Sequence, residues 1–251
     1  MRVQQHGNDL IQLTYYGFVN VYLVREEGGF TLVDTALRSC ASSIVQMAQQ
    51  FGQPIRRILL THAHADHSGG LDTVSALVPD AEFVMPARDA RFLTGDMSLD
   101  EGEPQDKLRG GWVMRKTSPT RLLYEGDRVG SLEVIATPGH TPGHCSFLDV
   151  RDRTLIAGDA FQTMGGVAVS GTFKPLFPLV YYATWHKGLA LESARKLRAL
   201  EPGRMAVGHG RLLKEPLAAM DRAITVLARD LEHQAKKPGT VSRTEREFSG
   251  W

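Results

Sequence analysis

The residues best suited to chemistry lie in THAHADHSGG, residues 61–70, which holds three of the nine histidines of the chain and one aspartate within six positions. In an extended segment, side chains two residues apart point the same way, so His62 and His64 can bind one cation together. Asp66 and His67 follow where the chain turns into a helix, so they face a different point. Imidazole and carboxylate ligands suit zinc or a similar divalent metal better than calcium or magnesium.

Three further residues repeat one arrangement, a metal-ligand type at the end of an apolar run and beside a glycine. They are His140 in ATPGHTPGH, Asp159 in LIAGDA and His209 in AVGHG. Glycine lets the backbone turn sharply and leaves room for a ligand. Because four ligands close a structural zinc site, the seven candidates together predict two metals with an open side for a substrate.

Short apolar runs that alternate with turn residues predict the strands that position these ligands. The predicted strands cluster in two groups along the chain, with helices flanking them, which predicts two packed sheets covered by helices. We expect one domain, residues 1–237, followed by a flexible tail, 238–251. Two segments, 94–111 and 161–185, are candidates for a lid, and the first is expected to be mobile. We expect strands at 10–14, 18–25, 29–34, 55–60, 81–86, 131–138, 145–150, 154–159 and 204–210, and helices at 39–51, 189–200 and 215–235.

Composition excludes several classes of protein. Apolar residues make up 42% of the chain, which is enough for a core, and 29 basic against 28 acidic residues argue against a nucleic-acid partner. No apolar run approaches the ~20 residues that cross a bilayer, and the N-terminus lacks a signal-peptide core. We therefore expect a cytoplasmic protein with reduced Cys40 and Cys145, no membrane partner, a small-molecule substrate and a homodimer as one option.

The motifs HAHADH, PGHTPGH, AGDA and GHG, in this order over residues 19–210, resemble those of the metallo-β-lactamase superfamily. The resemblance implies an α/β fold, the αβ/βα four-layer sandwich, in which two mixed β-sheets are flanked by helices. It also implies a site at one edge of the sandwich. The implied ligands are His62, His64 and His140 for the first metal, Asp66, His67 and His209 for the second, and Asp159 as a bridge between them.

Two residues near these motifs have less obvious roles. The resemblance makes Asp34 a residue that orients a ligand histidine, although it could equally cap the helix expected at 39–51. His144 repeats the histidine of its motif, and we expect it to form structural hydrogen bonds beneath the site. The same structural role is expected for His6, His186 and His233.

Two divalent cations ~3.5–4 Å apart can share a water and lower its pKa from 15.7 towards ~7. The sequence thus predicts a dinuclear hydrolase that uses metal-bound hydroxide on a small ester, lactone or thioester. Zn²⁺ is the expected metal, with Mn²⁺ or Fe²⁺ as alternatives. Asp159 would hold the metal spacing, and the resemblance allows Asp66 to accept or pass on a proton, so both are expected to be catalytic.

Several related activities compete with this prediction. Lactonases of the superfamily usually carry a tyrosine three residues after the bridging aspartate, where this chain has Gln162, although Tyr181 or Tyr182 could replace it. Glyoxalase-II-like thioesterases have a larger C-terminal helical region than residues 210–251 provide. The sulfur dioxygenases use one iron on the first site, and a β-lactamase would need export. Arg109, Arg115 and Lys116 are candidates for binding a substrate carboxylate, or are simply solvated.

Overall fold

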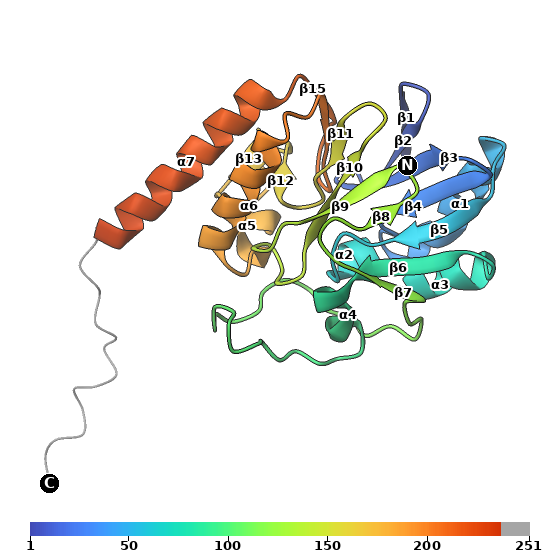
Figure 1. Cartoon of the computed structure of the whole chain (residues 1–251), viewed down its shortest axis with the longest axis horizontal. Helices are drawn as coiled ribbons and strands as arrows, with labels where there is room; N and C mark the ends of the chain where they lie inside the picture. The colour runs from blue at the N-terminus through green and yellow to red at the C-terminus, as the bar shows by residue number, and fades with distance from the viewer. Residues whose placement is uncertain (237–251) are drawn as a thin grey trace, which may run out of the picture.

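Two mixed β-sheets lie at the centre of the computed structural model, which describes residues 1–236 (Figure 1). The predicted tail at 238–251 lies outside the described residues. The first sheet runs β1 to β7 in sequence order, antiparallel up to β4 and parallel from β4 to β7. Its strands are β1 Arg2–His6, β2 Leu10–Tyr15, β3 Val19–Glu26, β4 Gly29–Val33, β5 Ile55–Leu59, β6 Glu82–Pro86 and β7 Arg121–Leu123.

The second sheet has six strands in the order β15-β14-β11-β10-β9-β8. Its only parallel pair is β11 with β14, which requires a long crossover, and helices α5 and α6 lie in that crossover. Its strands are β8 Arg128–Val129, β9 Leu132–Ala136, β10 Cys145–Asp149, β11 Thr154–Ile156, β14 Arg204–Ala206 and β15 Leu213–Lys214; β12 Phe161–Gln162 and β13 Ala168–Val169 form a separate small pair.

Three buried cores show that the molecule has four layers. Because side chains alternate between the two faces of a strand, β2 and β3 supply residues to two cores. Leu13 and Leu23 pack with helix α1, whereas Tyr22 and Val24 pack with Phe147 of the second sheet. A third core lies between the second sheet and helices α6 and α7. The αβ/βα sandwich expected from the resemblance is confirmed.

The helices cover the outer faces of the two sheets, with α1 and α3 beside the first and α6 and α7 beside the second (Figure 1). The expected helix at 39–51 begins as a 3₁₀ turn, Arg38–Cys40, before α1. The helix expected at 189–200 begins earlier because the His186 side chain accepts a hydrogen bond from Leu189 N and caps it. The helices are α1 Ala41–Gln50, α2 Ala65–Ser68, α3 Leu71–Leu77, α4 Ala87–Leu93, α5 Leu179–Ala183, α6 Lys187–Ala199 and α7 Leu217–Lys236.

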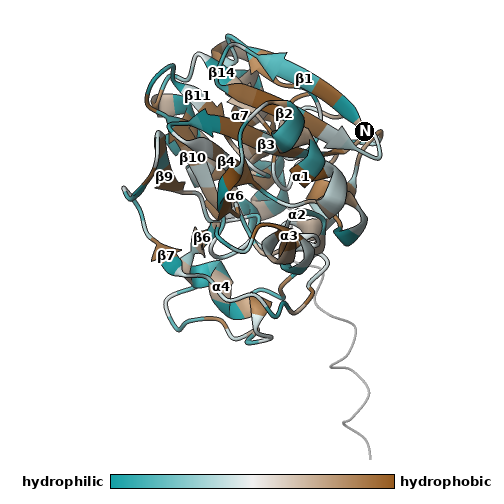
Figure 2. Ribbon diagram, turned by 90° about the vertical axis from the view of Figure 1, so that its right-hand side faces the viewer, coloured by the Kyte–Doolittle hydropathy of each residue, from teal (hydrophilic) through white to brown (hydrophobic). Residues whose placement is uncertain are grey.

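The outer edge of the first sheet is polar. Strand β1 is largely hydrophilic and exposed, whereas β2 beside it is buried along its whole length (Figure 2). Both cysteines are buried free thiols, as expected. Within residues 1–236, none of the helices has the length and apolar character needed to cross a membrane.

Candidate metal centre

All seven predicted ligand residues meet at one edge of the two sheets. His62 and His64 follow β5, Asp66 and His67 lie in α2, and the other three follow β9, β11 and β14. Their ligand atoms form three groups, each with its atoms within 4.8 Å of one another. The groups are His62, His64 and His140; His62, His67 and Asp159; and Asp66, His67 and His209.

In the first group, hydrogen bonds determine which ring nitrogen faces inward. The Thr61 hydroxyl donates to Asp34, so it accepts from His62 Nδ1 (2.9 Å) and leaves His62 Nε2 buried without a partner among the described residues. His64 uses the opposite nitrogen. Its Nε2 donates to the Arg109 carbonyl (2.9 Å), so Nδ1 faces His140 Nε2 at 3.0 Å.

A chain of hydroxyl groups holds the outer nitrogen of His140. His140 Nδ1 lies 2.9 Å from Ser170 Oγ, which lies 2.9 Å from Thr184 Oγ1. Because the Thr184 hydroxyl donates to the Val180 carbonyl in α5, the chain runs outward from the ring and His140 Nδ1 donates to Ser170. Nε2 is therefore left to face the centre.

The group of Asp66, His67 and His209 is called the second ligand group below, and that of His62, His64 and His140 the first. In the second ligand group, each histidine is held in the same manner. His67 Nδ1 donates to Asp34 Oδ2 (2.8 Å) and His209 Nδ1 donates to the Phe18 carbonyl (2.9 Å). Their Nε2 atoms lie 3.4 Å apart. Asp66 Oδ2 lies 3.4 Å from His209 Nε2 and 3.7 Å from His67 Nε2. A partner on the outer nitrogen fixes both the tautomer and the orientation of a metal-binding histidine.

Asp159 lies between the two groups. Its Oδ2 is 3.4 Å from His140 Nε2 and 3.1 Å from His209 Nε2, and its Oδ1 is 3.5 Å from His67 Nε2. Oδ1 is buried with no hydrogen-bond partner among residues 1–236. A Cβ at residue 208 would overlap Asp159 Oδ1, which explains the glycine that precedes His209.

The charges of this cluster oppose one another strongly. Burial alone would raise the pKa of Asp159, but His209 and His67 outweigh it and hold that pKa well below its usual range. Burial likewise disfavours the charged form of His209, yet Asp159 and Asp66 together raise its pKa to about 10. Burial lowers the pKa values of His62 and His140 well below normal. Without metal, the second group therefore carries protons where a cation would bind.

The structure decides between the two roles considered for Asp34. Leu37, not Asp34, precedes the first helical turn, and the Asp34 carboxylate accepts hydrogen bonds from His67 and from both Thr61 N and Oγ1. Asp34 has a left-handed backbone conformation, with φ of 64°. Asp34 therefore orients His67 and does not cap the helix.

His144 lies beneath the site with both ring nitrogens engaged. Nε2 accepts from Asp159 N (3.0 Å), so Nδ1 carries the proton and donates to Thr137 Oγ1 (2.8 Å). Burial lowers its pKa to about 3. With no nitrogen free to bind a cation, His144 has the structural role that we expected.

Several residues that hold the site have no signal in the sequence. The carbonyl groups of Arg109 and Phe18 bind ligand histidines, and any residue type has a carbonyl. The end of the segment expected to be a mobile insertion is in fact in contact with the site. There Gly111 O accepts from Ala65 N, and the Trp112 ring lies 4.5 Å from the His64 ring.

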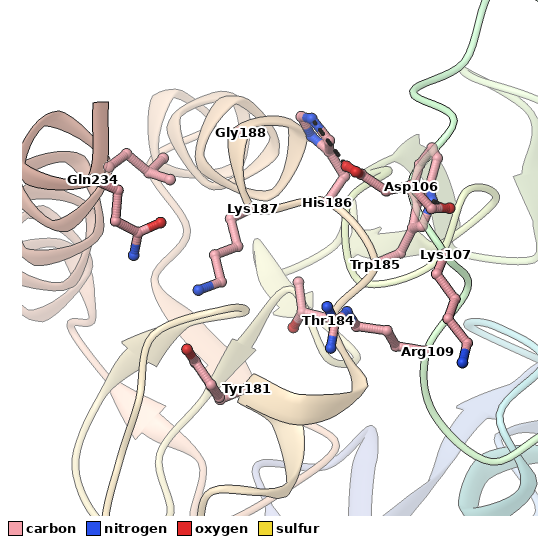
Figure 3. Close-up of a pocket in the computed structure, with 11 residues that line it drawn as sticks. Asp106, Lys107, Arg109, Tyr181, Thr184, Trp185, His186, Lys187, Gly188 and Gln234 are labelled. Atoms are coloured by element: carbon pink, nitrogen blue, oxygen red, sulfur yellow. Dashed lines mark hydrogen bonds and ion pairs between the residues drawn. The ribbon is translucent and has the colours of Figure 1, made fainter. Parts of the chain in front are cut away.

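A cavity of about 40 Å³ opens onto the cluster, with Leu179, Val180 and Ala183 of α5 as its apolar wall. Tyr181 lines a separate pocket of about 330 Å³ with the Arg109 and Lys187 side chains (Figure 3). Tyr182 is largely exposed, so neither tyrosine lines the cavity at the metal ligands. Gln162, in the position where lactonases have tyrosine, is buried and lines no part of that cavity.

The basic residues considered for a substrate carboxylate lie away from this cavity. The Arg109 side chain faces the pocket of Figure 3, although its carbonyl binds His64. Arg115 and Lys116 line another pocket, of about 430 Å³, with Arg38 and Asp72. The side chains of Arg109, Arg115 and Lys116 therefore do not line the cavity at the predicted metal ligands.

Comparison with known proteins gives a consistent result. The model of the metallo-β-lactamase superfamily matches residues 14–209. The uncharacterized protein YobT of Bacillus subtilis is 47% identical over 89% of this chain and 97% of its own length. The hydroxyacylglutathione hydrolase of Rhodospirillum rubrum is 31% identical over 76% of this chain and 62% of its own length. A solved β-lactamase from Chitinophaga pinensis has the same fold, with a TM-score of 0.66, 20% identity and coverage of 94% and 95% of the two chains.

Proposed function

The chain belongs to the metallo-β-lactamase superfamily of hydrolytic enzymes, and from this premise we propose that it is a dinuclear hydrolase of a small ester, lactone or thioester. The observation that carries the proposal is the position of Asp159. One carboxylate lies within 3.5 Å of His140, His67 and His209, which belong to two different ligand groups. A carboxylate that contacts both groups can bridge two cations.

The donor set fits two divalent cations. His62 Nε2 and Asp159 Oδ1 are buried polar atoms without hydrogen-bond partners among the described residues, and such atoms are costly unless a ligand satisfies them. In each of the five histidines, a protein group binds the outer ring nitrogen, so the inner ring nitrogen faces the site. Nitrogen and carboxylate donors of this kind suit Zn²⁺, with Mn²⁺ and Fe²⁺ as alternatives.

The bound cations and the residues around them would have different roles in hydrolysis. Two bound cations would supply an activated water and polarise the carbonyl of the substrate. The side chain of Asp66 is 36% exposed, whereas those of Asp159 and His209 are almost fully buried. Asp66 is therefore the solvent-accessible carboxylate of the ligand groups. Burial would raise its pKa, but His67 and His209 hold that pKa below its usual range, so its proposed catalytic role is to pass on a proton from the ionised state.

The surroundings of the site favour an acyl compound with an apolar part. Leu179, Val180 and Ala183 form one side of the cavity and carry no charge. The Rhodospirillum rubrum relative, named for hydrolysis of an acyl conjugate of glutathione, supports a thioester among the substrates to test. A mononuclear iron oxygenase would leave the group of Asp66, His67 and His209 without a role.

The first experiment is metal analysis of protein purified without added metal or chelator, followed by assays on a panel of lactones, esters and thioesters. We expect close to two equivalents of zinc or manganese, and hydrolysis that is lost on dialysis against a chelator and restored by metal. One equivalent of iron in the purified protein, together with no hydrolysis of any panel member after reconstitution with zinc or manganese, would contradict the proposal.

A further inference from the structure

Asp89 is a fully buried aspartate in α4 that none of the metal groups includes. Its Oδ2 accepts hydrogen bonds from Ala63 N (3.0 Å) and Thr141 Oγ1 (2.8 Å), and its Oδ1 accepts one from Gly143 N (2.7 Å). The neighbouring Arg88 forms ion pairs with Glu103 and Asp100 instead. Asp89 is thus a buried carboxylate held by three donors.

The donors belong to the two loops that carry the first ligand group. Ala63 lies between His62 and His64, and Thr141 follows His140 directly. These loops extend from different sheets, one from β5 and the other from β9. Asp89 therefore joins the two sheets at the point where their ligands must meet at a fixed distance.

The close packing around Asp89 shows that this connection is specific. A Cβ at residue 143 would overlap both Asp89 N and Asp89 Oδ1, so the PGHTPGH loop can approach α4 only with glycine there. Burial raises the pKa of Asp89 to about 6, while the bonds from Thr141, Ala63 and Gly143 lower it. The three donors, two of them backbone N–H groups, thus favour the charged carboxylate against its burial.

We propose that Asp89 is a positioning residue that sets the spacing of His62 and His64 relative to His140, and so forms the first of the two metal sites. Asp34 has the corresponding role for His67 in the second group. The inference rests on the proposed metal centre but concerns one half of it. Asp89 contacts neither a ligand atom nor the cavity, so it acts only through the two loops.

Asp89→Asn tests this role without changing the size of the side chain. In either orientation of the amide, its NH₂ group faces a backbone N–H, that of Ala63 or that of Gly143, so one loop loses its acceptor. Residues that hold metal ligands typically change metal affinity about 10–100-fold when mutated. We expect at least a tenfold loss of affinity for one of the two equivalents in a chelator competition titration, and a changed absorption spectrum of the Co²⁺-loaded protein.

Asp72→Asn is the matched control. Asp72 also accepts from two backbone N–H groups and a threonine hydroxyl, but these belong to Lys116 and Thr117, away from the ligand loops. It should keep the wild-type affinities and the Co²⁺ spectrum. Thr141→Val removes one of the three donors to Asp89 and should show a smaller loss in the same direction, which keeps the test valid if Asp89→Asn does not fold.

The outcomes separate the two proposals. A wild-type protein that binds no metal would contradict the dinuclear centre itself. If the wild type binds two equivalents and Asp89→Asn holds both within twofold of wild type, the metal centre stands and the positioning role is wrong. A lower Tm of Asp89→Asn with unchanged affinities would also overturn the proposal, because it would show that Asp89 only stabilises the fold.

Discussion

At the scale of single residues, the site is organised before any metal binds. Each of the five ligand histidines donates its outer ring hydrogen to a different group, from the hydroxyls of Thr61 and Ser170 to the carboxylate of Asp34. Four histidines present Nε2 and one, His64, presents Nδ1. The inner ring nitrogens are thus aimed into the site by the protein, and a cation that displaces the protons of His67 and His209 would meet donors that are already oriented.

Asp159→Ala should remove the contact between the two ligand groups. Because Asp159 is the carboxylate within reach of both His140 and His209, we expect the loss of one metal equivalent and of nearly all hydrolysis. Metal analysis and the rate of hydrolysis of the best panel substrate measure both effects. Unchanged activity with two bound metals would contradict the bridging role.

His144→Asn should leave the metal content unchanged. Both nitrogens of His144 are engaged by Asp159 N and Thr137 Oγ1, so the substitution removes hydrogen bonds beneath the site and no ligand. We expect destabilisation of about 1–3 kcal/mol, the usual cost of unsatisfied buried groups, with two metals still bound. Metal analysis and urea unfolding measure these effects, and the loss of one equivalent would make His144 a ligand.

At the scale of elements, helix α5 connects the proposed metal centre to the cavity beside it. Val180 and Ala183 line the cavity, and the Val180 carbonyl ends the hydroxyl chain that holds His140. The cavity of about 40 Å³ is close to the volume of one or two waters, each of which occupies ≈ 30 Å³ in the liquid. Leu179 lines this cavity and is half-exposed, so an acyl chain longer than the cavity would extend along it.

Leu179→Asn tests whether the apolar part of the substrate contacts α5. Each buried CH₂ contributes about 0.8 kcal/mol, roughly a fourfold gain in kcat/KM for each added methylene of the acyl chain. We expect this gain to shrink in the variant, since Leu179 lines the cavity and is half-exposed. The measurement is kcat/KM over a series of acyl chain lengths, at unchanged metal content.

Leu176→Asn is the control for the Leu179 variant. Leu176 is 84% exposed in the same segment and does not line the cavity, so its variant should keep the wild-type dependence on chain length. An equal dependence in all three proteins would show that the acyl chain lies elsewhere.

At the scale of the whole molecule, the proposed metals would compete with protons for the same buried cluster. In the metal-free protein the pKa of His209 is about 10, above the 6.5 of an ordinary histidine. A raised pKa in the folded state stabilises the fold fully below pH 6.5, and this contribution is lost as the pH rises through about 10. Bound metal would replace the proton and remove this dependence.

The Tm of the metal-free protein should therefore fall as the pH rises from 6.5 to 10, and the zinc-loaded protein should lack this part of the fall. Metal binding at pH 7 should also release protons, because His209 must lose its proton to bind. Thermal unfolding of both forms and calorimetry in buffers of different ionisation enthalpy measure these effects. Parallel Tm curves and no proton release would contradict the assignment of His209 as a ligand.

The sequence alone determined the fold class and which residues could meet at the site. Alternation of apolar residues predicts which strand faces are buried, and ligand residues at strand ends must lie at an edge of a sheet. These are local patterns, so they can be read along the chain. Helix ends depend on individual capping contacts and are harder to predict from the pattern. The expected helices at 39–51 and 189–200 therefore differ from α1 and α6 mainly at their ends, and the His186 cap sets the start of α6.

Only the tertiary structure decided how those residues are held. The choice of Nδ1 in His64 depends on the Arg109 carbonyl, 45 residues away, and the role of Asp34 depends on His67. Asp89 has no motif around it, yet it joins the loops of His62 and His140. Such contacts follow from how two sheets and α4 pack together, and backbone donors and acceptors are the same for every residue type. They therefore leave no pattern in the sequence.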